Sequence, residues 1–111
     1  PRDTNAEGSI FGGVILSYID QAAYVEAKRQ TPLRYVTVSM KEVVFKEPVH
    51  VGDVLSLYAQ TTRIGRSSMT ISVRVMAERF AKPNCTASVT EAEVVMVAIG
   101  DDCRPREIVI E

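Results

Sequence analysis

The chain has 111 residues, of which 46% are hydrophobic and 24% are charged, and its 13 basic and 14 acidic side chains give a formal net charge of −1. This length and composition are typical of one globular domain, so we expect residues 1–111 to form a single domain. The near-neutral charge argues against nucleic acid as a partner, because non-specific binding needs a basic surface. A chain this short rarely encloses a deep pocket for a large ligand, which makes a second copy an expected partner.

The 2 Cys and 1 His exclude several chemistries. Cys85 and Cys103 form no C-x-x-C pair, and with a single His they leave too few ligands for a zinc site. We expect both thiols to be reduced in the cytoplasm. His50 leads into a turn, and the Gly-x-Ser run at 65–67 lacks the later Gly of a nucleophile elbow, so no Ser-His-Asp triad is expected. No stretch is apolar for long enough to span a membrane, and no signal peptide is visible.

Residues 11–29 show the period of an amphipathic helix of about five turns. Lys28 and Arg29 in its last turn suit the negative end of the helix dipole, and Pro32 follows. The apolar residues at helical spacing predict the buried face, which we expect to consist of Phe11, Val14, Ile15, Tyr18, Ile19, Ala22 and Val25.

From residue 35 onward the hydrophobic period changes to two, which predicts strands. A bulge near residues 41–42 is expected in the first strand, because the parity changes between Val36, Val38, Met40 and then Val43, Phe45. Further strands are expected from residue 55 to a turn at Gly65, over 69–77 and over 85–99. One helix and four long antiparallel strands define an α+β architecture in which the sheet curls over the helix. The last strand is apolar on both faces over 94–99, which indicates cover by another subunit.

Asp20 is the most informative residue of the predicted helix. Its neighbours three, four and seven positions away are mostly small or apolar, and no Lys or Arg stands three or four positions away. Such neighbours let another backbone approach closely and would partly desolvate a carboxylate that acts as a general base. The alternative is an ordinary solvated Asp on a helix surface.

Gly12 and Gly13 fall in the first turn of the predicted helix, where each costs about 1 kcal/mol in helix propensity. The first N–H groups of a helix have no intrahelical partner, and a Gly lets a substrate oxygen reach them, as in an oxyanion hole. The alternative is a cap or a close helix–sheet crossing. Asn5 could orient a water or a carbonyl with its amide, or it could be an ordinary turn residue.

The segment that joins the second and third predicted strands combines two Arg, two hydroxyls and a Gly turn. These groups could form an anion-binding nest, whose residues would be Arg63, Gly65, Arg66, Ser67 and Ser68. The segment is not a P-loop, because it lacks the second Gly and the Lys. An ordinary polar hairpin is the alternative.

Four blocks of sequence occur in the order found in one enzyme family. They are D-T-N-x-x-G-x-x-F-G-G-x-x-L-x-x-x-D over 3–20, V-T-V over 36–38, F-x-x-P-V-x-x-G-D over 45–53 and G-R-S-S over 65–68. Through these blocks the chain, from residue 1 to about residue 99, resembles the hotdog-fold acyl-CoA thioesterases of the acyl-CoA hydrolase branch.

The resemblance implies a hotdog fold, in which a long central helix is wrapped by an antiparallel sheet that continues into a second subunit, often in a trimer of dimers. It implies hydrolysis of acyl-CoA to a free acid and CoA at the dimer interface, without a metal or other cofactor. Asp20 matches the catalytic carboxylate, which acts as general base or nucleophile, and Asn5 matches an Asn that faces it from the partner. The amides of Gly12 and Gly13 match the region that polarises the thioester carbonyl, and residues 66–68 match a segment near the CoA nucleotide.

Two features depart from the family. Relatives usually have a strand directly before the P-x-D-T-N stretch, so the sheet is expected to lack an edge strand, unless the sequence is trimmed. The run Cys103-Arg104-Pro105-Arg106 matches nothing in the family. Two other functions stay open: a hydratase or dehydratase on the same fold, which usually presents a His that this helix lacks, and a non-catalytic acyl-CoA sensor.

Overall fold

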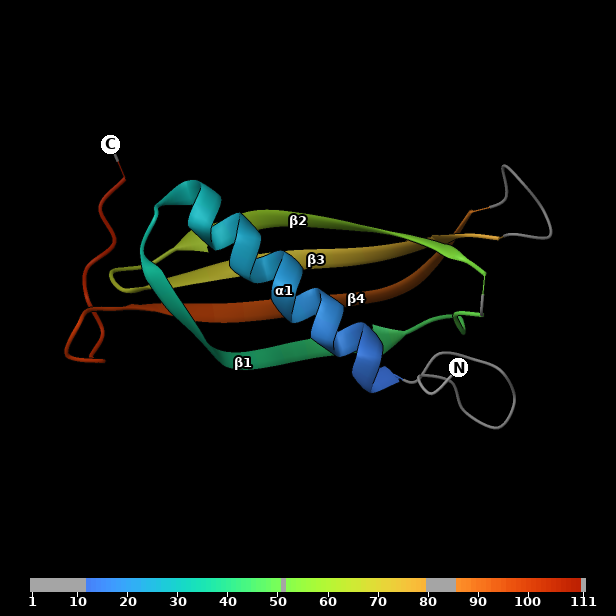
Figure 1. The fold of residues 1–111 in the computed structure, drawn as a ribbon, viewed down its shortest axis with the longest axis horizontal. Coiled ribbons are helices and arrows are strands. Elements are labelled where there is room, and N and C mark those ends of the chain that lie inside the picture. Colours follow the sequence, from blue (N-terminus) through green and yellow to red (C-terminus); the bar gives the residue numbers. More distant parts are fainter. Residues whose placement is uncertain (1–11, 51, 80–85, 111) are drawn as a thin grey trace.

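The computed structural model describes residues 12–50, 52–79 and 86–110. Within these residues one helix, α1 (Gly12–Gln30), lies along one face of an antiparallel sheet (Figure 1). The four strands are β1 (Arg34–Phe45), β2 (Val54–Ile64), β3 (Ser68–Glu78) and β4 (Thr86–Ile99). The predicted α+β architecture is confirmed, and α1 ends one residue beyond the predicted end of the helix.

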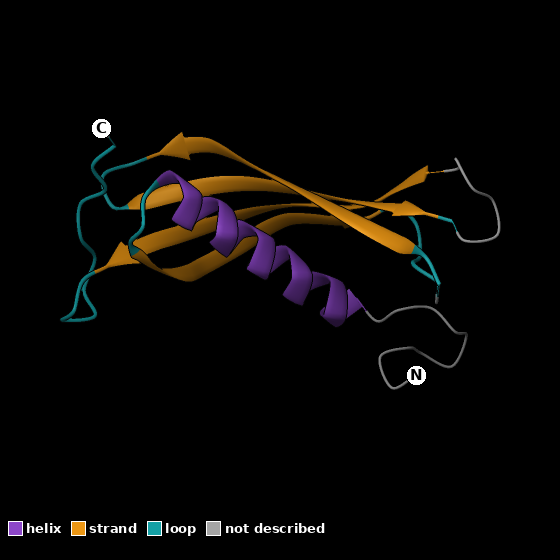
Figure 2. Ribbon diagram, turned by 45° about the horizontal axis from the view of Figure 1, so that its top comes forward, coloured by secondary structure: helices purple, strands orange, loops and turns teal. Residues whose placement is uncertain are grey.

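The sheet has the strand order β1-β4-β3-β2, so the first strand pairs with the last one. Strands β2, β3 and β4 pair with their neighbours in sequence, whereas β1 joins the sheet on the far side of β4. In Figure 2 the strands twist behind the helix, which covers the middle of their face. Among the described strands, β1 and β2 are the two edges of the sheet.

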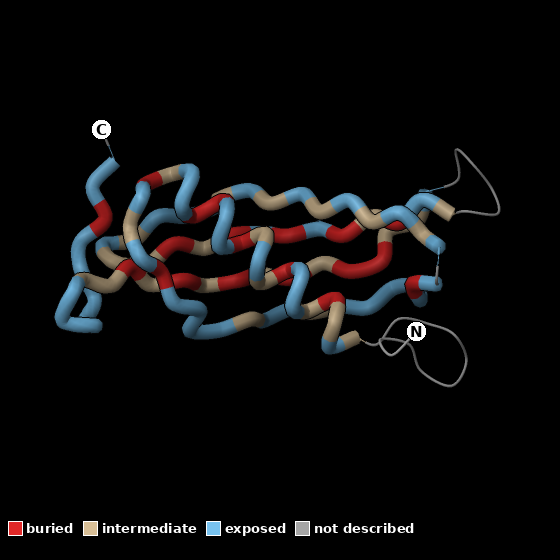
Figure 3. Tube along the Cα trace, viewed as in Figure 1, coloured by how far each residue is buried: buried red, intermediate tan, exposed pale blue. Residues whose placement is uncertain are grey.

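The core lies between α1 and the two central strands (Figure 3). Alternate residues of β3 are fully buried, as the period of two predicts, and they are Met69, Ile71, Val73, Val75 and Ala77. Val94, Met96 and Ala98 of β4 are buried on the same face of the sheet as these residues of β3. Each larger aliphatic side chain buried in this way contributes roughly 1.5–3 kcal/mol to folding, so the two central strands provide much of the stability.

The buried face of the helix differs from the predicted one. Its buried residues are Ile15, Ile19, Ala23, Glu26 and Ala27. Tyr18 is 41% exposed and Val25 is 66% exposed, so the prediction was wrong for these two residues. The small side chains of Ala23 and Ala27 let the helix backbone approach the sheet closely, and this turns larger apolar groups to the side. A face rich in Ala has a weak hydrophobic signal in the sequence, which explains the error.

Strand β1 contains the predicted bulge and a second one. The ladder to β4 shifts between Lys41 and Val44, where Glu42 has a φ of 55°, and this confirms the bulge expected near residues 41–42. The ladder also shifts between Thr37 and Ser39, a second bulge that the hydrophobic pattern does not predict. The extra residue separates positions that were expected to share one face. Met40 packs against the core, whereas Val36 and Val38 are exposed.

A buried carboxylate ties the helix to β2. Glu26 is 6% exposed, and its Oε1 accepts a hydrogen bond of 2.8 Å from Arg29. Its Oε2 accepts two hydrogen bonds from Thr61 in β2, one from the backbone N–H at 3.2 Å and one from the hydroxyl at 2.9 Å. Gln30 donates a further hydrogen bond at 3.2 Å. The hydrogen bond from Arg29, together with those from Thr61 and Gln30, outweighs desolvation and lowers the pKa of Glu26 from 4.5 to about 2. The ionised side chain therefore stabilises the fold, because its charged form is the better acceptor.

This pKa shift predicts how stability depends on pH. A carboxyl whose pKa is depressed in the folded state stabilises it fully above the unfolded value of 4.5 and loses that contribution as the pH falls toward about 2. The shift corresponds to about 3 kcal/mol. Glu26→Gln should lower the free energy of unfolding at pH 7 and flatten its decline between pH 4.5 and 2, as measured by urea denaturation. Glu78→Gln, at an exposed position, is the matched control and should leave both unchanged. A decline as steep in Glu26→Gln as in the wild type would contradict this assignment.

Candidate functional site

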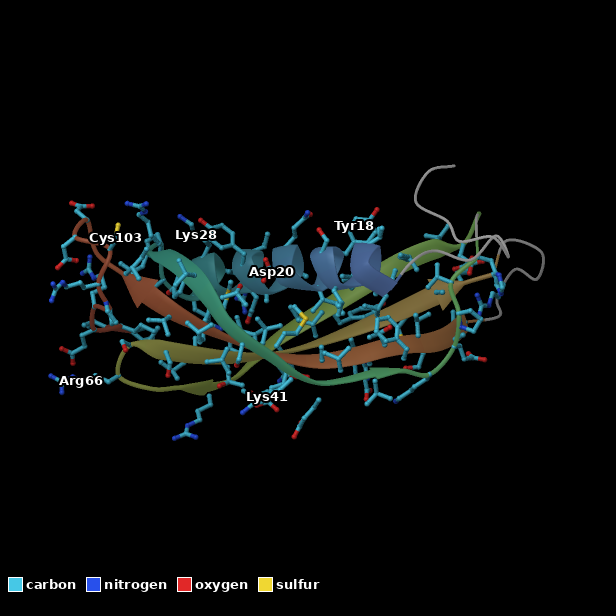
Figure 4. All side chains as sticks on the ribbon, turned by 90° about the horizontal axis from the view of Figure 1, so that it is seen from below. Tyr18, Asp20, Lys28, Lys41, Arg66 and Cys103 are labelled. Carbon is cyan, nitrogen blue, oxygen red and sulfur yellow. The ribbon has the colours of Figure 1, made fainter. Side chains whose placement is uncertain are left out.

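Asp20 lies on the side of α1 that faces β1, midway along the helix (Figure 4). Its Oδ1 accepts a hydrogen bond of 2.5 Å from the hydroxyl of Thr37 in β1. The two residues open onto a hollow of about 540 Å³. The hollow is lined by Asp20, Gln21, Tyr24, Val25, Tyr35, Val36, Thr37 and Met96. Asp20 is thus a half-buried carboxylate in a mostly apolar surrounding.

This arrangement suits proton transfer. Thr37 holds one oxygen of the carboxylate, and within the described residues no other side chain bonds or pairs with Asp20. The second oxygen can therefore accept a proton from a water in the hollow. Thr37 was not singled out in the sequence, where it is a polar residue inside the V-T-V run. Its role depends on which helix turn β1 crosses, and hydrophobic periodicity contains no information on that crossing.

Gly12 is the first residue of α1 and lies against β1. A Cβ at this position would be 3.3 Å from Cζ of Phe45, so the close helix–sheet crossing weighed for the Gly pair is present at Gly12. A Cβ at Gly13 would meet nothing within 4 Å. Gly12 and Phe45 also line a second hollow, of about 300 Å³, whose other residues are Ile15, Lys46, Glu47, Pro48, Val49 and Val89.

The two halves of the predicted active site are apart within one chain. Gly12 and Asp20 are eight residues apart on the helix, which separates their backbones by about 12 Å along its axis. A base and an oxyanion donor must both lie about 3 Å from one reacting group. One chain therefore does not bring Asp20 together with the amides of Gly12 and Gly13. Asn5, the fourth predicted catalytic residue, lies outside the described residues.

The predicted anion-binding segment forms the turn between β2 and β3. The N–H of Gly65 donates to the carbonyl of Ser68 at 2.8 Å, and a Cβ on Gly65 would be 2.7 Å from the Ser68 hydroxyl oxygen, so a larger residue would require the Ser68 side chain to move. Arg63 and Arg66 are exposed on either side of this turn, and Ser67 is half-buried. In Figure 4 the turn, marked by Arg66, is at the same end of the molecule as Lys28 near the end of α1.

Other kinds of site receive no support from the described residues. His50 is exposed and its N–H donates to Asp53 at 2.9 Å, as expected for a turn residue. No group of three His, Cys, Asp or Glu side chains in the described part is arranged to hold a metal ion. The helix of the described chain is not apolar enough over its length to cross a membrane.

The family follows from comparison with known proteins. The profile of the thioesterase superfamily matches residues 7–81. The acyl-CoA thioester hydrolase YciA of Salmonella typhimurium is 35% identical over 113 residues, which cover 100% of this chain and 85% of that protein. The chain therefore belongs to the thioesterase superfamily.

Solved structures agree with this assignment. A hexameric hotdog-fold thioesterase of Campylobacter jejuni superposes with a TM-score of 0.85 at 42% identity, covering 100% of this chain and 84% of that one. A hexameric, broad-specificity acyl-coenzyme A thioesterase superposes with a TM-score of 0.89 at 39% identity, covering 100% and 76%. The hotdog fold implied by the sequence motifs is confirmed.

Proposed function

We propose that this protein is an acyl-CoA thioesterase, which hydrolyses acyl-CoA to a free carboxylic acid and CoA. The observation that carries the proposal is the contact between Asp20 and Thr37, which presents a half-buried carboxylate at the edge of an apolar hollow. Relatives that are 35–40% identical over nearly the whole chain are named acyl-CoA thioester hydrolases, which supports the same reaction.

Asp20 acts as a general base in the proposed reaction. It takes a proton from a water as the water oxygen bonds to the thioester carbonyl carbon, and the carbonyl oxygen becomes an oxyanion. Helix-terminal N–H groups at Gly12 and Gly13 of a second copy stabilise this oxyanion. The C–S bond then breaks, CoA leaves as a thiolate that takes up the proton, and the acid is released. A thiolate is a good leaving group, so the reaction needs no metal and no other cofactor.

The site is completed by a second copy of the chain, in this proposal. β1 is an edge strand whose Val36 and Val38 are 42% and 55% exposed, which suits pairing with another edge. An antiparallel β1–β1 pair centred near Lys41 would place Thr37 of one copy opposite Phe45 of the other, since 37 and 45 are equally far from 41. Phe45 contacts Gly12, so this pairing would bring the amides of one copy toward Asp20 of the other.

The same pairing gives Asn5 a role. The family motif places this Asn across the dimer interface from the catalytic carboxylate, and we propose that Asn5 of the second copy orients the attacking water beside Asp20. Three such dimers would make the trimer of dimers that the resemblance implies. Solved thioesterases that superpose on this chain are hexameric, which supports this assembly.

The CoA part of the substrate extends toward the β2–β3 turn in this proposal. Asp20 and Gln30 are ten residues apart on α1, so the helix spans about 15 Å between the carboxylate and the end of the molecule that carries the turn. Arg63, Arg66 and the turn amides, with Ser67 and Ser68, would meet CoA phosphates there.

We also propose a cytoplasmic location. Cys103 is an exposed free thiol, and thiols stay reduced in the cytoplasm.

Replacing the base should reduce turnover with the fold intact. Asp20→Asn removes proton acceptance but keeps the size of the side chain, so kcat should fall by roughly 10²–10⁴-fold. A thiol reagent that detects CoA release from a panel of acyl-CoA substrates measures this. Glu78→Gln, which also replaces a carboxylate by an amide but at an exposed position of β3, is the control and should retain activity. Unchanged hydrolysis by Asp20→Asn would refute the proposed function.

The contact with Thr37 should matter through its hydroxyl. Thr37→Val keeps the shape of the side chain and removes the hydrogen bond to Asp20, so kcat should fall by about tenfold, which equals about 1.4 kcal/mol. Thr37→Ser keeps the hydroxyl and should restore most of the activity. Equal kcat values for the Val and Ser variants would show that the hydroxyl has no part in catalysis.

A shared site can be tested by mixing two inactive variants. Consider a mixed dimer of one Asp20→Ala chain and one Asn5→Ala chain. If each site takes Asp20 from one chain and Asn5 from the other, one site of this dimer carries both changes and the other site carries neither. Random mixing after unfolding and refolding should then restore about a quarter of the wild-type activity, since half of the dimers are mixed and half of their sites are intact. If both residues of a site came from one chain, every site would carry a change and activity would not return.

A further inference from the structure

Arg79 fixes the segment that follows β1. This residue comes directly after β3, and its guanidinium donates to the carbonyl of Pro48 at 3.1 Å and to Oδ2 of Asp53. The same Asp53 oxygen accepts a hydrogen bond of 2.9 Å from the N–H of His50, and the N–H of Asp53 donates to the carbonyl of His50 at 3.1 Å. One guanidinium, with its acceptors on Pro48 and Asp53, therefore forms a clamp between this turn and the end of β3.

The clamp contains an ion pair that is largely withdrawn from water. The side chain of Asp53 is 4% exposed and that of Arg79 is 19% exposed. Burial raises the pKa of Asp53, but the hydrogen bonds from the N–H of His50 and from Arg79 outweigh this effect and hold the pKa below its usual value. Both partners are therefore charged at neutral pH, which strengthens their hydrogen bond.

The clamped segment forms one wall of the hollow beside Gly12. Residues 46–49 line this hollow of about 300 Å³, together with residues from the first turns of α1. In Figure 1 the start of α1 and the chain that follows β1 lie at the same end of the molecule. The buried members of the lining all have aliphatic side chains and are at most 3% exposed; they are Ile15, Val49 and Val89. The inner surface of the hollow is therefore apolar.

The proposed reaction brings the acyl chain to the edge of this hollow. The thioester carbonyl oxygen lies at the amides of Gly12 and Gly13, and the acyl chain is bonded to the same carbon atom as this oxygen. Gly12 also lines the hollow, so the first methylenes of the chain lie at its edge. The hollow beside Asp20 continues instead along α1 past Tyr24, toward the end of the molecule where we place CoA. The apolar hollow beside Gly12 is thus left for the acyl group.

We propose that this hollow binds an aliphatic acyl chain and that Arg79, as a positioning residue, sets the preference of the enzyme for chain length. The inference rests on the proposed thioesterase function and specifies the acyl part of the substrate. Arg79 holds the carbonyl of Pro48 and thereby the next residue, Val49, which lines the hollow. Because the clamp fixes this wall before substrate arrives, less conformational entropy is lost when the chain binds.

The test measures kcat and KM for straight-chain acyl-CoA substrates from acetyl to dodecanoyl. For the wild type, KM should fall by about fourfold with each added methylene until the hollow is filled, the equivalent of about 0.8 kcal/mol. Arg79→Met keeps an unbranched stem but removes every donor, so this gain should fall below about twofold per methylene. For acetyl-CoA, which is too short to reach the wall, both constants should stay nearly the same. Arg79→Lys keeps a charged donor and should restore part of the gain.

Two further variants complete the test. Arg74→Ala is the control, because Arg74 is an exposed residue in the middle of β3 and lies over the ring of Tyr58, so its loss should leave the chain-length dependence unchanged. Val49→Ala enlarges the hollow and leaves the clamp in place. Its preferred chain should be longer by roughly one or two methylenes, since two carbon atoms are removed. An unchanged preference in Val49→Ala would overturn the assignment of the hollow to the acyl chain.

The outcomes separate this inference from the proposed function. If Arg79→Met raised KM by the same factor for every chain length, or for none, Arg79 would have only a structural role and the inference would be wrong. A wild-type KM that does not depend on chain length would exclude the hollow as the acyl site, while the thioesterase function would stand. Failure of the wild type to hydrolyse any acyl-CoA would refute the proposed function, and this inference with it.

Discussion

The structure depends on an imbalance between one helix and the sheet that it must cover. A helix of 19 residues is about 28 Å long and about 10 Å wide, whereas four strands set about 4.8 Å apart form a sheet about 19 Å wide. The helix therefore cannot cover all four strands, and on its side of the sheet Phe45 of β1, beside Gly12, is 48% exposed. Exposed apolar surface at an edge strand favours association. The proposed pairing with a second copy would cover this part of β1.

The regular parts of the fold could be predicted from the sequence because each has an undisturbed period. β3 alternates without interruption, and its apolar positions are the buried ones. The helix face was misjudged because Ala and a buried carboxylate, Glu26, contribute little hydrophobic signal. The bulge at Thr37–Ser39 was missed because no Gly, Pro or break in the pattern marks it in the sequence.

The candidate site was predictable only in part, for a geometric reason. Asp20 stood out because it lacks a basic neighbour on its helix face, and this is a local property of the sequence. Thr37 can donate its hydrogen bond to Asp20 only because β1 passes the helix beside Asp20, and this is a property of the tertiary structure. The distance between Gly12 and Asp20 could have been deduced from helix rise alone. That distance is the physical reason why a site with both groups requires two chains.

The strand order has a consequence for how the chain acquires its structure. β1 pairs with β4, so 40 residues of chain (46–85) separate the two strands, whereas β2, β3 and β4 pair with direct neighbours. Closing that long loop costs entropy before any contact compensates for it. The meander of β2, β3 and β4 can therefore form first, with α1 and β1 docking later. On the ribosome, α1 and β1 would emerge long before β4, so their apolar side chains would need protection from aggregation until β4 has been synthesised.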